Sequence, residues 1–333
     1  MSYNANSGYG RALLDAVSAI VPTFGRIFVV KNATSDTTDP NYQALQEIFG
    51  SAPDGVVRFY TSLSAAFDAC TTNNNDVILL DSHTSHKVAS MLTINKNKVH
   101  FIGMDGGSRL NNARTLISNT STGAATDTSM IKITGSGCTF RNISFKNNWT
   151  AAENLYAVSL EAAAYTYFEN CTFNNLGSAH LTNANCAPLA LVAAEDSEFK
   201  NCTMGTNTVK MTASGGQVVL ISGATTRSIW TDCLFQVITS QTNYTMLNIA
   251  GNGNNDLQLF RRCAFINRIN GGATAAVAVK SDATTAGIVV FDTGTFCAGC
   301  TDFATAAVGN TGMYIASPVP TAGTSGIAVQ PTA

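Results

Sequence analysis

The chain has 333 residues, with 19 Lys and Arg against 21 Asp and Glu, which gives a formal net charge of −2. Only 12% of its residues are charged, whereas an average soluble domain has about 25%. A near-neutral chain without a basic block is a poor candidate for nucleic-acid binding. The hydrophobic content of 45% argues against intrinsic disorder. We therefore expect a folded protein, rich in sheet and tight turns, with no nucleic-acid partner.

The N-terminal sequence predicts neither export nor membrane insertion. The first apolar stretch, Ala12–Val21, is interrupted by Asp15 and lacks the basic flank of a signal peptide. No run of about 18 apolar residues occurs that could span a bilayer. The nine cysteines are odd in number and spread along the chain, unlike the dense disulfide framework of a small secreted domain. We expect reduced cysteines, synthesis in a cytoplasm and no membrane partner.

Residues 1–56 are predicted to stand apart from the repeats that follow and to serve in anchoring or assembly. Gly10–Val21 can form a short amphipathic helix, and Arg26–Val30 can form a strand. Asp39–Asn41 is typical of a cap or turn before a second helical piece, Tyr42–Phe49.

A short helix is predicted at about residues 61–70, where the repeats begin. Leu63–Cys70 has helical spacing of apolar residues, and the turn Thr72–Asn75 follows it. The next elements expected are two strands, Asp76–Leu80 and Val99–Gly103. A helix at this point would cap the open end of a coil of strands and protect its first edges.

Two histidines, His83 and His86, lie three residues apart close to Asp81. They would be candidate metal ligands if the segment were helical. Because the segment follows a strand and is rich in Ser and Thr, a turn is the expected structure. We predict no cofactor and keep His83 and His86 as candidate ligands only.

From residue 140 onward, a six-residue motif begins and ends with an aromatic residue in its clearest copies and repeats through the chain. One clear copy is Phe168–Phe173, with the sequence FENCTF. The leading aromatics are separated by 28, 31, 31, 30 and 31 residues, which indicates a structural repeat. These leading residues are Phe140, Phe168, Phe199, Trp230, Phe260 and Phe291.

A second pattern of alternating apolar residues runs in phase with the motif. Alternation over four to six residues marks a strand with one buried face, so each period is expected to hold two short strands. The pairs are Ile131/Ile133, Val158/Leu160, Leu189/Leu191, Val219/Ile221, Leu247/Ile249 and Val277/Val279. Two or three strands per period of about 30 residues, without helices, indicate a parallel β-solenoid.

In such a coil, equivalent positions of successive turns stack at about 4.8 Å. The motif cysteines would then form an internal ladder beside the leading aromatics. Because cysteines about 30 residues apart form no chelating motif, we interpret them as small buried hydrophobes. These cysteines are Cys171, Cys202, Cys233 and Cys263. One Cys-x-x-Cys pair, Cys297 and Cys300, does not by itself define a zinc or redox site.

The segment His100–Gly107, HFIGMDGG, resembles the entrance to pectin-lyase-like right-handed parallel β-helices. In that family a short amphipathic helix precedes the first turn, as predicted here. The resemblance covers about residues 60–305 and implies an all-β, single-stranded right-handed parallel β-helix of about seven turns. We place this β-helix at residues 57–305, between the N-terminal region 1–56 and an uncharged C-terminal tail, 306–333.

Pectin-lyase-like folds include polysaccharide lyases and glycosidases, so acidic clusters are candidate catalytic groups. The densest cluster holds Glu195, Asp196 and Glu198. Strand alternation would place Glu195 and Ser197 on one face, and Asp196 and Glu198 on the other. The Asn-Thr-Asp, Asp-Asp and Gly-His-Gly motifs of polygalacturonase-type enzymes are absent. We therefore expect a solvated turn, with these three carboxylates as catalytic candidates only.

Three functions are consistent with these features. The first is a non-enzymatic bacteriophage virion protein that decorates the head shell, because the chain is similar in fold and composition to β-helical phage structural proteins. Such a protein would assemble in the host cytoplasm, form a homotrimer and contact the major capsid protein or other virion proteins. The second is a tail spike that recognises cell-surface polysaccharide. The third is a polysaccharide lyase or glycosidase.

Overall fold

The computed structural model describes most of the chain between residues 25 and 306 and two short strands beyond. The described residues are 25–32, 38, 40–50, 57–82, 84–105, 115–119, 124, 126–177, 181–251, 256–268, 276–281, 287–306, 312–315 and 327–328. The helix predicted at Gly10–Val21 lies outside these residues, as does nearly all of the predicted tail.

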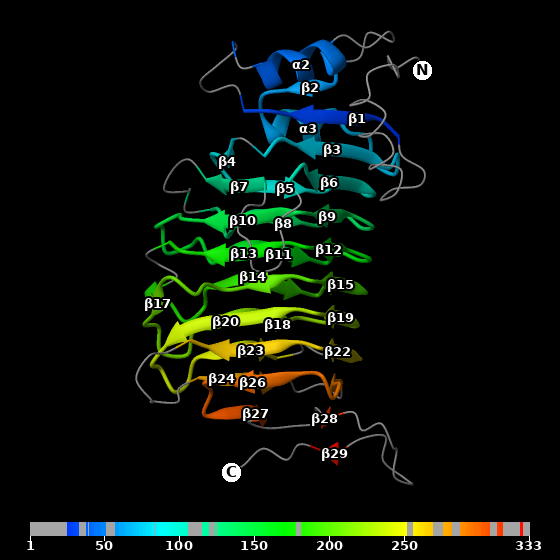
Figure 1. Cartoon of the computed structure of the whole chain (residues 1–333). Helices are drawn as coiled ribbons and strands as arrows, with labels where there is room; N and C mark the ends of the chain where they lie inside the picture. Colours follow the sequence, from blue (N-terminus) through cyan, green and yellow to red (C-terminus); the bar gives the residue numbers. More distant parts are fainter. Residues whose placement is uncertain are drawn as a thin grey trace.

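Three long sheets run the length of the molecule as the faces of one coil (Figure 1). The first sheet contains, in spatial order, β2 (Phe59–Tyr60), β1 (Ile27–Val30), β3 (Asp76–Leu80), β6 (Val99–Gly103), β9 (Thr139–Arg141), β12 (Tyr167–Glu169), β15 (Ser197–Lys200), β19 (Ser228–Thr231), β22 (Leu257–Arg261), β25 (Ile288–Phe291), β28 (Gly312–Ile315) and β29 (Ile327–Ala328).

The other two sheets follow the same stacking order (Figure 1). The second contains β4 (His86–Val88), β7 (Thr115–Asn119), β10 (Ile143–Asn147), β13 (Thr172–Asn175), β16 (Thr203–Met204), β20 (Leu234–Thr239), β23 (Ala264–Asn267) and β26 (Phe296–Ala298), with β17 (Lys210–Met211) beside β20. The third contains β5 (Leu92–Ile94), β8 (Ser129–Ile133), β11 (Tyr156–Glu161), β14 (Ala187–Val192), β18 (Gln217–Ser222), β21 (Thr245–Ile249), β24 (Val277–Ser281) and β27 (Asp302–Ala306).

From β3 to β27 the chain visits the three sheets in rotation, and the third sheet gains one strand in each round until it has eight. All described strand pairs are parallel except β28 with β29. Connections between parallel strands of one sheet are right-handed in almost all proteins. The protein is therefore the right-handed parallel β-helix expected from the sequence, with a number of turns close to the predicted seven.

Each turn holds three strands, the larger of the two numbers expected, because the aromatic motif is divided between two sheets. The residue before the motif cysteine has a positive φ, for example 54° at Asn170 and 53° at Asn201. Asn tolerates this left-handed conformation better than most residues. The chain bends there, so that the leading aromatic lies at or next to the end of a strand of the first sheet, and the residues after the cysteine enter the second.

The leading aromatics stack face to face inside the coil. From Phe140 to Phe291, successive ring centroids lie 4.0 to 5.7 Å apart with interplanar angles of 2° to 22°. The motif cysteines line the same core. The thiol of Cys171 donates to the carbonyl of Phe140 one turn earlier, at 3.5 Å, and Cys233 donates likewise to Phe199 at 3.4 Å. Burial raises the pKa of Cys233, which favours its neutral thiol form.

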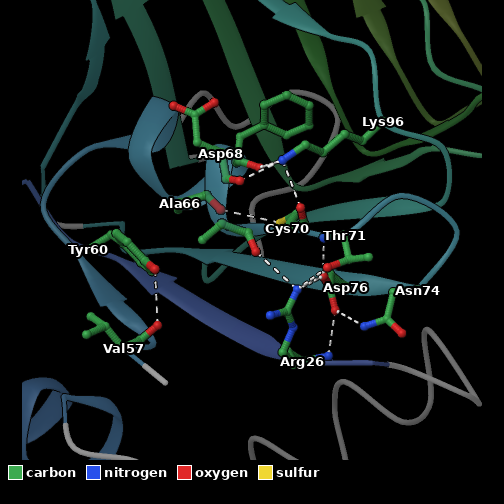
Figure 2. Close-up of polar contacts among 12 residues, drawn as sticks. Arg26, Val57, Tyr60, Ala66, Asp68, Cys70, Thr71, Asn74, Asp76 and Lys96 are labelled. Atoms are coloured by element: carbon green, nitrogen blue, oxygen red, sulfur yellow. Dashed lines mark hydrogen bonds and ion pairs between the residues drawn. The ribbon is translucent and has the colours of Figure 1, made fainter. Parts of the chain in front are cut away.

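Helix α3 (Leu63–Ala69) closes the N-terminal end of the core, at the position predicted for a capping helix. Its last carbonyls are held by two basic side chains (Figure 2). The ammonium of Lys96 donates to the carbonyls of Phe67, Asp68 and Cys70 at 2.7 to 2.9 Å. The guanidinium of Arg26 donates to the Ala69 carbonyl at 3.1 Å. These contacts satisfy carbonyls that a helix end leaves without partners.

The N-terminal region 1–56 contributes to the coil as well as covering it. Strand β1 pairs with β3 along its full length, so it belongs to the first sheet. Helix α2 (Pro40–Phe49) packs on the outer face of that sheet, where Tyr42, Leu45 and Phe49 meet Ile27 and Val77. The division at residue 57 stays a prediction. No helix in the described part of the chain is long and apolar enough to cross a membrane.

Candidate functional surface

Beyond α2, the outer face of the first sheet carries rows of charged side chains that connect successive turns. Strand register places Arg141, Glu169 and Lys200 directly beside one another in β9, β12 and β15. Glu169 Oε2 lies 2.7 Å from the Arg141 guanidinium, and its Oε1 lies 3.3 Å from Lys200 Nζ. The Glu169 carboxylate is therefore held from both neighbouring turns.

A second row of ion pairs runs along the edge of this face, at the turns that lead into the first sheet. The guanidinium of Arg227 donates to both carboxylate oxygens of Asp196, at 2.6 and 3.0 Å. It also lies 3.5 Å from Asp256, one turn further along. On the opposite edge of the sheet, Arg262 forms the same two-pronged contact with Asp232, with both distances 2.8 Å. Bidentate pairs of this kind fix geometry as well as charge.

The three carboxylates of the predicted cluster do not converge on one point. Asp196 is bound to Arg227, Glu195 is exposed in the turn, and Glu198 lies half-buried on the outer face of β15. The expectation that Glu195 and Ser197 share a face is wrong, because Ser197 is buried. Asp196 has a positive φ of 48°, which interrupts the alternation of the strand.

Two tyrosines lie next to these charges. Glu198 of β15 is in register with Tyr167 of β12, and the Arg141 guanidinium lies 5.2 Å from the centre of the Tyr167 ring. Burial raises the pKa of Tyr167, and the negative charge of Glu169 raises it further. Tyr165 is 65% exposed and so presents its ring to solvent. We call Tyr165, Tyr167 and Glu198 the tyrosine face.

Of the two histidines predicted as candidate ligands, the structure describes His86. His86 is buried, and its Nε2 lies 2.8 Å from the carbonyl oxygen of Asp81. Burial lowers the pKa of His86, which favours the neutral ring. His83 lies outside the described residues. Among the residues that the structure describes, no three His, Cys, Asp or Glu side chains gather as a metal site.

Sequence reasoning missed the polar cluster at the N-terminal end of the coil (Figure 2). The buried carboxylate of Asp76 accepts hydrogen bonds from Arg26, Thr71 and Asn74 at 2.7 to 2.9 Å. Burial alone would raise the pKa of Asp76, but these hydrogen bonds outweigh it and lower the pKa. An acidic residue directly before four apolar residues was the available signal, but its partner Arg26 is 50 residues distant.

No protein-family model matches the sequence, and no curated protein matches it. Solved structures similar to this chain include a pectin methylesterase from Aspergillus niger, with 12% identity over 86% of this chain and 85% of that one, and a TM-score of 0.49. ORF18 of Geobacillus virus E2 has 13% identity over 83% of this chain and 62% of that one, with a TM-score of 0.38. An alginate lyase from Paenibacillus has 15% identity over 75% of this chain and 94% of that one, with a TM-score of 0.38. At such low identity, no activity of these proteins transfers to this chain.

Proposed function

We propose that the protein is a non-enzymatic structural component of a bacteriophage virion, namely a capsid decoration protein that studs or stabilises the head shell. The observation that supports a scaffold role is that ion pairs join successive turns along the coil. Arg141, Glu169 and Lys200 link three successive turns, and Asp196 is paired with Arg227 of the next turn. Carboxylates held in this way stiffen a column and are poorly placed to accept protons from a substrate.

The bacteriophage context rests on the sequence, whose sparse charge and β-helical repeat resemble phage structural proteins. In this assembly, we propose that residues 1–56 anchor the protein to the major capsid protein or to another virion protein, and that the copies form homotrimers. The copy number of the chain in purified particles, measured by quantitative mass spectrometry, tests this location. Many copies per particle support decoration of the head, and a handful of copies contradict it.

The enzymatic alternative is tested with the purified protein on pectin, polygalacturonate and alginate, with chain cleavage and methanol release as readouts. The proposed function predicts no turnover above the buffer control. Turnover that is abolished by Glu195→Ala or Glu198→Ala would overturn it. Asp196→Ala is the third variant, because loss of activity there alone would place the chemistry at the ion pair with Arg227.

A second candidate function is recognition of cell-surface polysaccharide, as in a tail spike. The tyrosine face favours it, because the exposed ring of Tyr165 beside fixed polar groups can stack on a sugar ring and hydrogen-bond to hydroxyls. Glycan-array binding that is lost in Tyr165→Ala, but kept in Tyr60→Phe at the far end of the coil, would favour this function. Absence of binding to host surface glycans would contradict this second function and favour decoration of the head.

A further inference from the structure

Two cysteines at the C-terminal end of the coil differ from all the others. Of the nine cysteines, the seven from Cys70 to Cys263 are buried, whereas Cys297 and Cys300 are partly exposed. The exposed pair therefore meets solvent reagents while the rest of the thiols are protected by the core.

A single glycine brings the two exposed thiols together. Cys297 lies in β26, and Gly299 follows with a φ of 72°. A Cβ atom at Gly299 would lie 2.2 Å from the backbone oxygen of Asn267, so no other residue fits this turn. The chain bends there from β26 towards β27, and the Cys300 thiol donates to the carbonyl oxygen of Ala298 at 3.7 Å. Cys297 and Cys300 are close enough for each to shift the pKa of the other.

The thiol pair lies where the core reaches the end of the coil. Cys297 is in register with Phe265 of the preceding turn. Both thiols pack against the core together with Phe303, whose ring lies edge-on to Phe291 at 4.9 Å. The N-terminal end is closed by α3, and this group of side chains lies in and between the last strands of the second and third sheets.

We propose that Cys297 and Cys300 form a reversible intrachain disulfide by exchange with a small-molecule disulfide such as oxidised glutathione. The Cys297 thiolate attacks one sulfur of the reagent, which breaks its S–S bond and releases one thiolate. The Cys300 sulfur then attacks Cys297 Sγ, forms the Cys297–Cys300 bond and releases the second thiolate. The two protons lost by the cysteines go to the released thiolates, so two thiols of the reagent are formed.

The Cys300 thiol donates to the Ala298 carbonyl at 3.7 Å, which favours its protonated form and assigns the order of the two thiols in this exchange. The interaction between the two side chains also lowers the pKa of Cys297 and raises that of Cys300, so Cys297 is the thiolate that attacks first. The proposal goes beyond the structural role above and does not depend on it. A virion protein would, however, encounter this chemistry when it leaves a reducing cytoplasm.

The sequence allows the state of Cys297 and Cys300 to be measured by mass spectrometry on a single tryptic fragment. Lys280 is the last basic residue, so the tryptic fragment 281–333 contains Cys297 and Cys300 and no other cysteine. The reduced, folded full chain is equilibrated with oxidised glutathione, quenched by alkylation and digested. We expect this fragment to lose two hydrogen atoms and to take up no alkylating reagent, while the other cysteines react only after denaturation.

Matched serine variants test the order of attack. Cys300→Ser is expected to stop at a stable glutathione adduct on Cys297, formed several-fold faster than the adduct on Cys300 in Cys297→Ser. Circular dichroism of the reduced variants checks that both fold like the parent. Three results would overturn the proposal: the parent fragment stays fully alkylatable in the folded protein, only glutathione adducts accumulate, or disulfides form between two copies of the chain.

Discussion

The left-handed residue before each motif cysteine decides how a turn of the coil is divided. Asn142, Asn170, Asn201, Asp232 and Arg262 all have φ values between 51° and 58° at equivalent positions. Asn170 also donates to the side-chain oxygen of Asn142 at 2.8 Å, which adds a polar contact between turns. Conformation and hydrogen bonding therefore both favour Asn at this bend.

Replacing Asn201 separates these two contributions. Asn201→Gly and Asn201→Val both remove the amide, but only Val resists a positive φ. We expect Asn201→Val to be less stable than Asn201→Gly by about 1–3 kcal/mol, measured by denaturant unfolding. Equal stabilities of the two variants would show that the backbone conformation at this residue is not what constrains the turn.

His100 makes the folded state sensitive to acid. Its ring is buried, and burial, followed by the nearby positive charge of Arg141, lowers its pKa to about 4. The unfolded chain has a histidine pKa of about 6.5, so it binds more protons between these two values. We expect the free energy of unfolding to fall as the pH is lowered from about 6.5 towards 4.

The His100→Gln variant is the control for this pH dependence. Denaturant unfolding at a series of pH values should show a shallower loss of stability than in the parent protein. The slope that remains is expected from His86, whose pKa burial also lowers. Superimposable pH profiles of the parent and His100→Gln would contradict the assignment.

At the level of strands and helices, the repeat predicted two of the three sheets. The leading aromatics lie in strands of the first sheet, and the alternating apolar pairs lie in strands of the third. The second sheet was missed as a separate sheet because its strands begin directly after the bend, within the same motif. In β16 such a strand is only two residues long, Thr203–Met204, too short for a pattern.

The candidate surface was less predictable than the fold. Glu195, Asp196 and Glu198 are neighbours in sequence, but the structure separates them and pairs Asp196 with Arg227, 31 residues away. Likewise, β1 joins the first sheet beside β3, about 50 residues later in the chain. Contacts of this kind depend on which strands lie side by side, and residue order alone does not specify them.

Helix α3 provides a test of the capped end of the coil. Lys96 donates three hydrogen bonds to its last carbonyls and lies 5.1 Å from the centre of the Phe67 ring. Lys96→Met keeps the aliphatic stem but removes the charge and the donors. Because hydrogen bonds to charged groups contribute about 1.5–3 kcal/mol, we expect a loss of that order in unfolding free energy.

Hydrogen exchange of the α3 amides is the more local measurement. They should exchange faster in Lys96→Met, because the end of the core opens more often. Lys87→Met, at an exposed position of β4, is the matched control and should change neither exchange nor stability. Unchanged exchange in α3 of the Lys96 variant would mean that the lysine does not hold the cap.

For the whole molecule, the stacked architecture accounts for the low content of charged residues. Equivalent residues of neighbouring turns lie about 4.8 Å apart, so like charges at one position would repel their own copies. Where charges do occur on the outer face, they alternate in sign, as in Arg141, Glu169 and Lys200. The result is a column whose turns are joined through the aromatic core and across the surface.

The proposed scaffold role is tested most directly by looking for the chain in purified bacteriophage particles. Cryo-electron microscopy would show whether the coil is present and where it is attached. We predict coil-shaped density at many equivalent positions on the head shell. Density only at the tail tip, or particles that lack the chain, would contradict the proposed function.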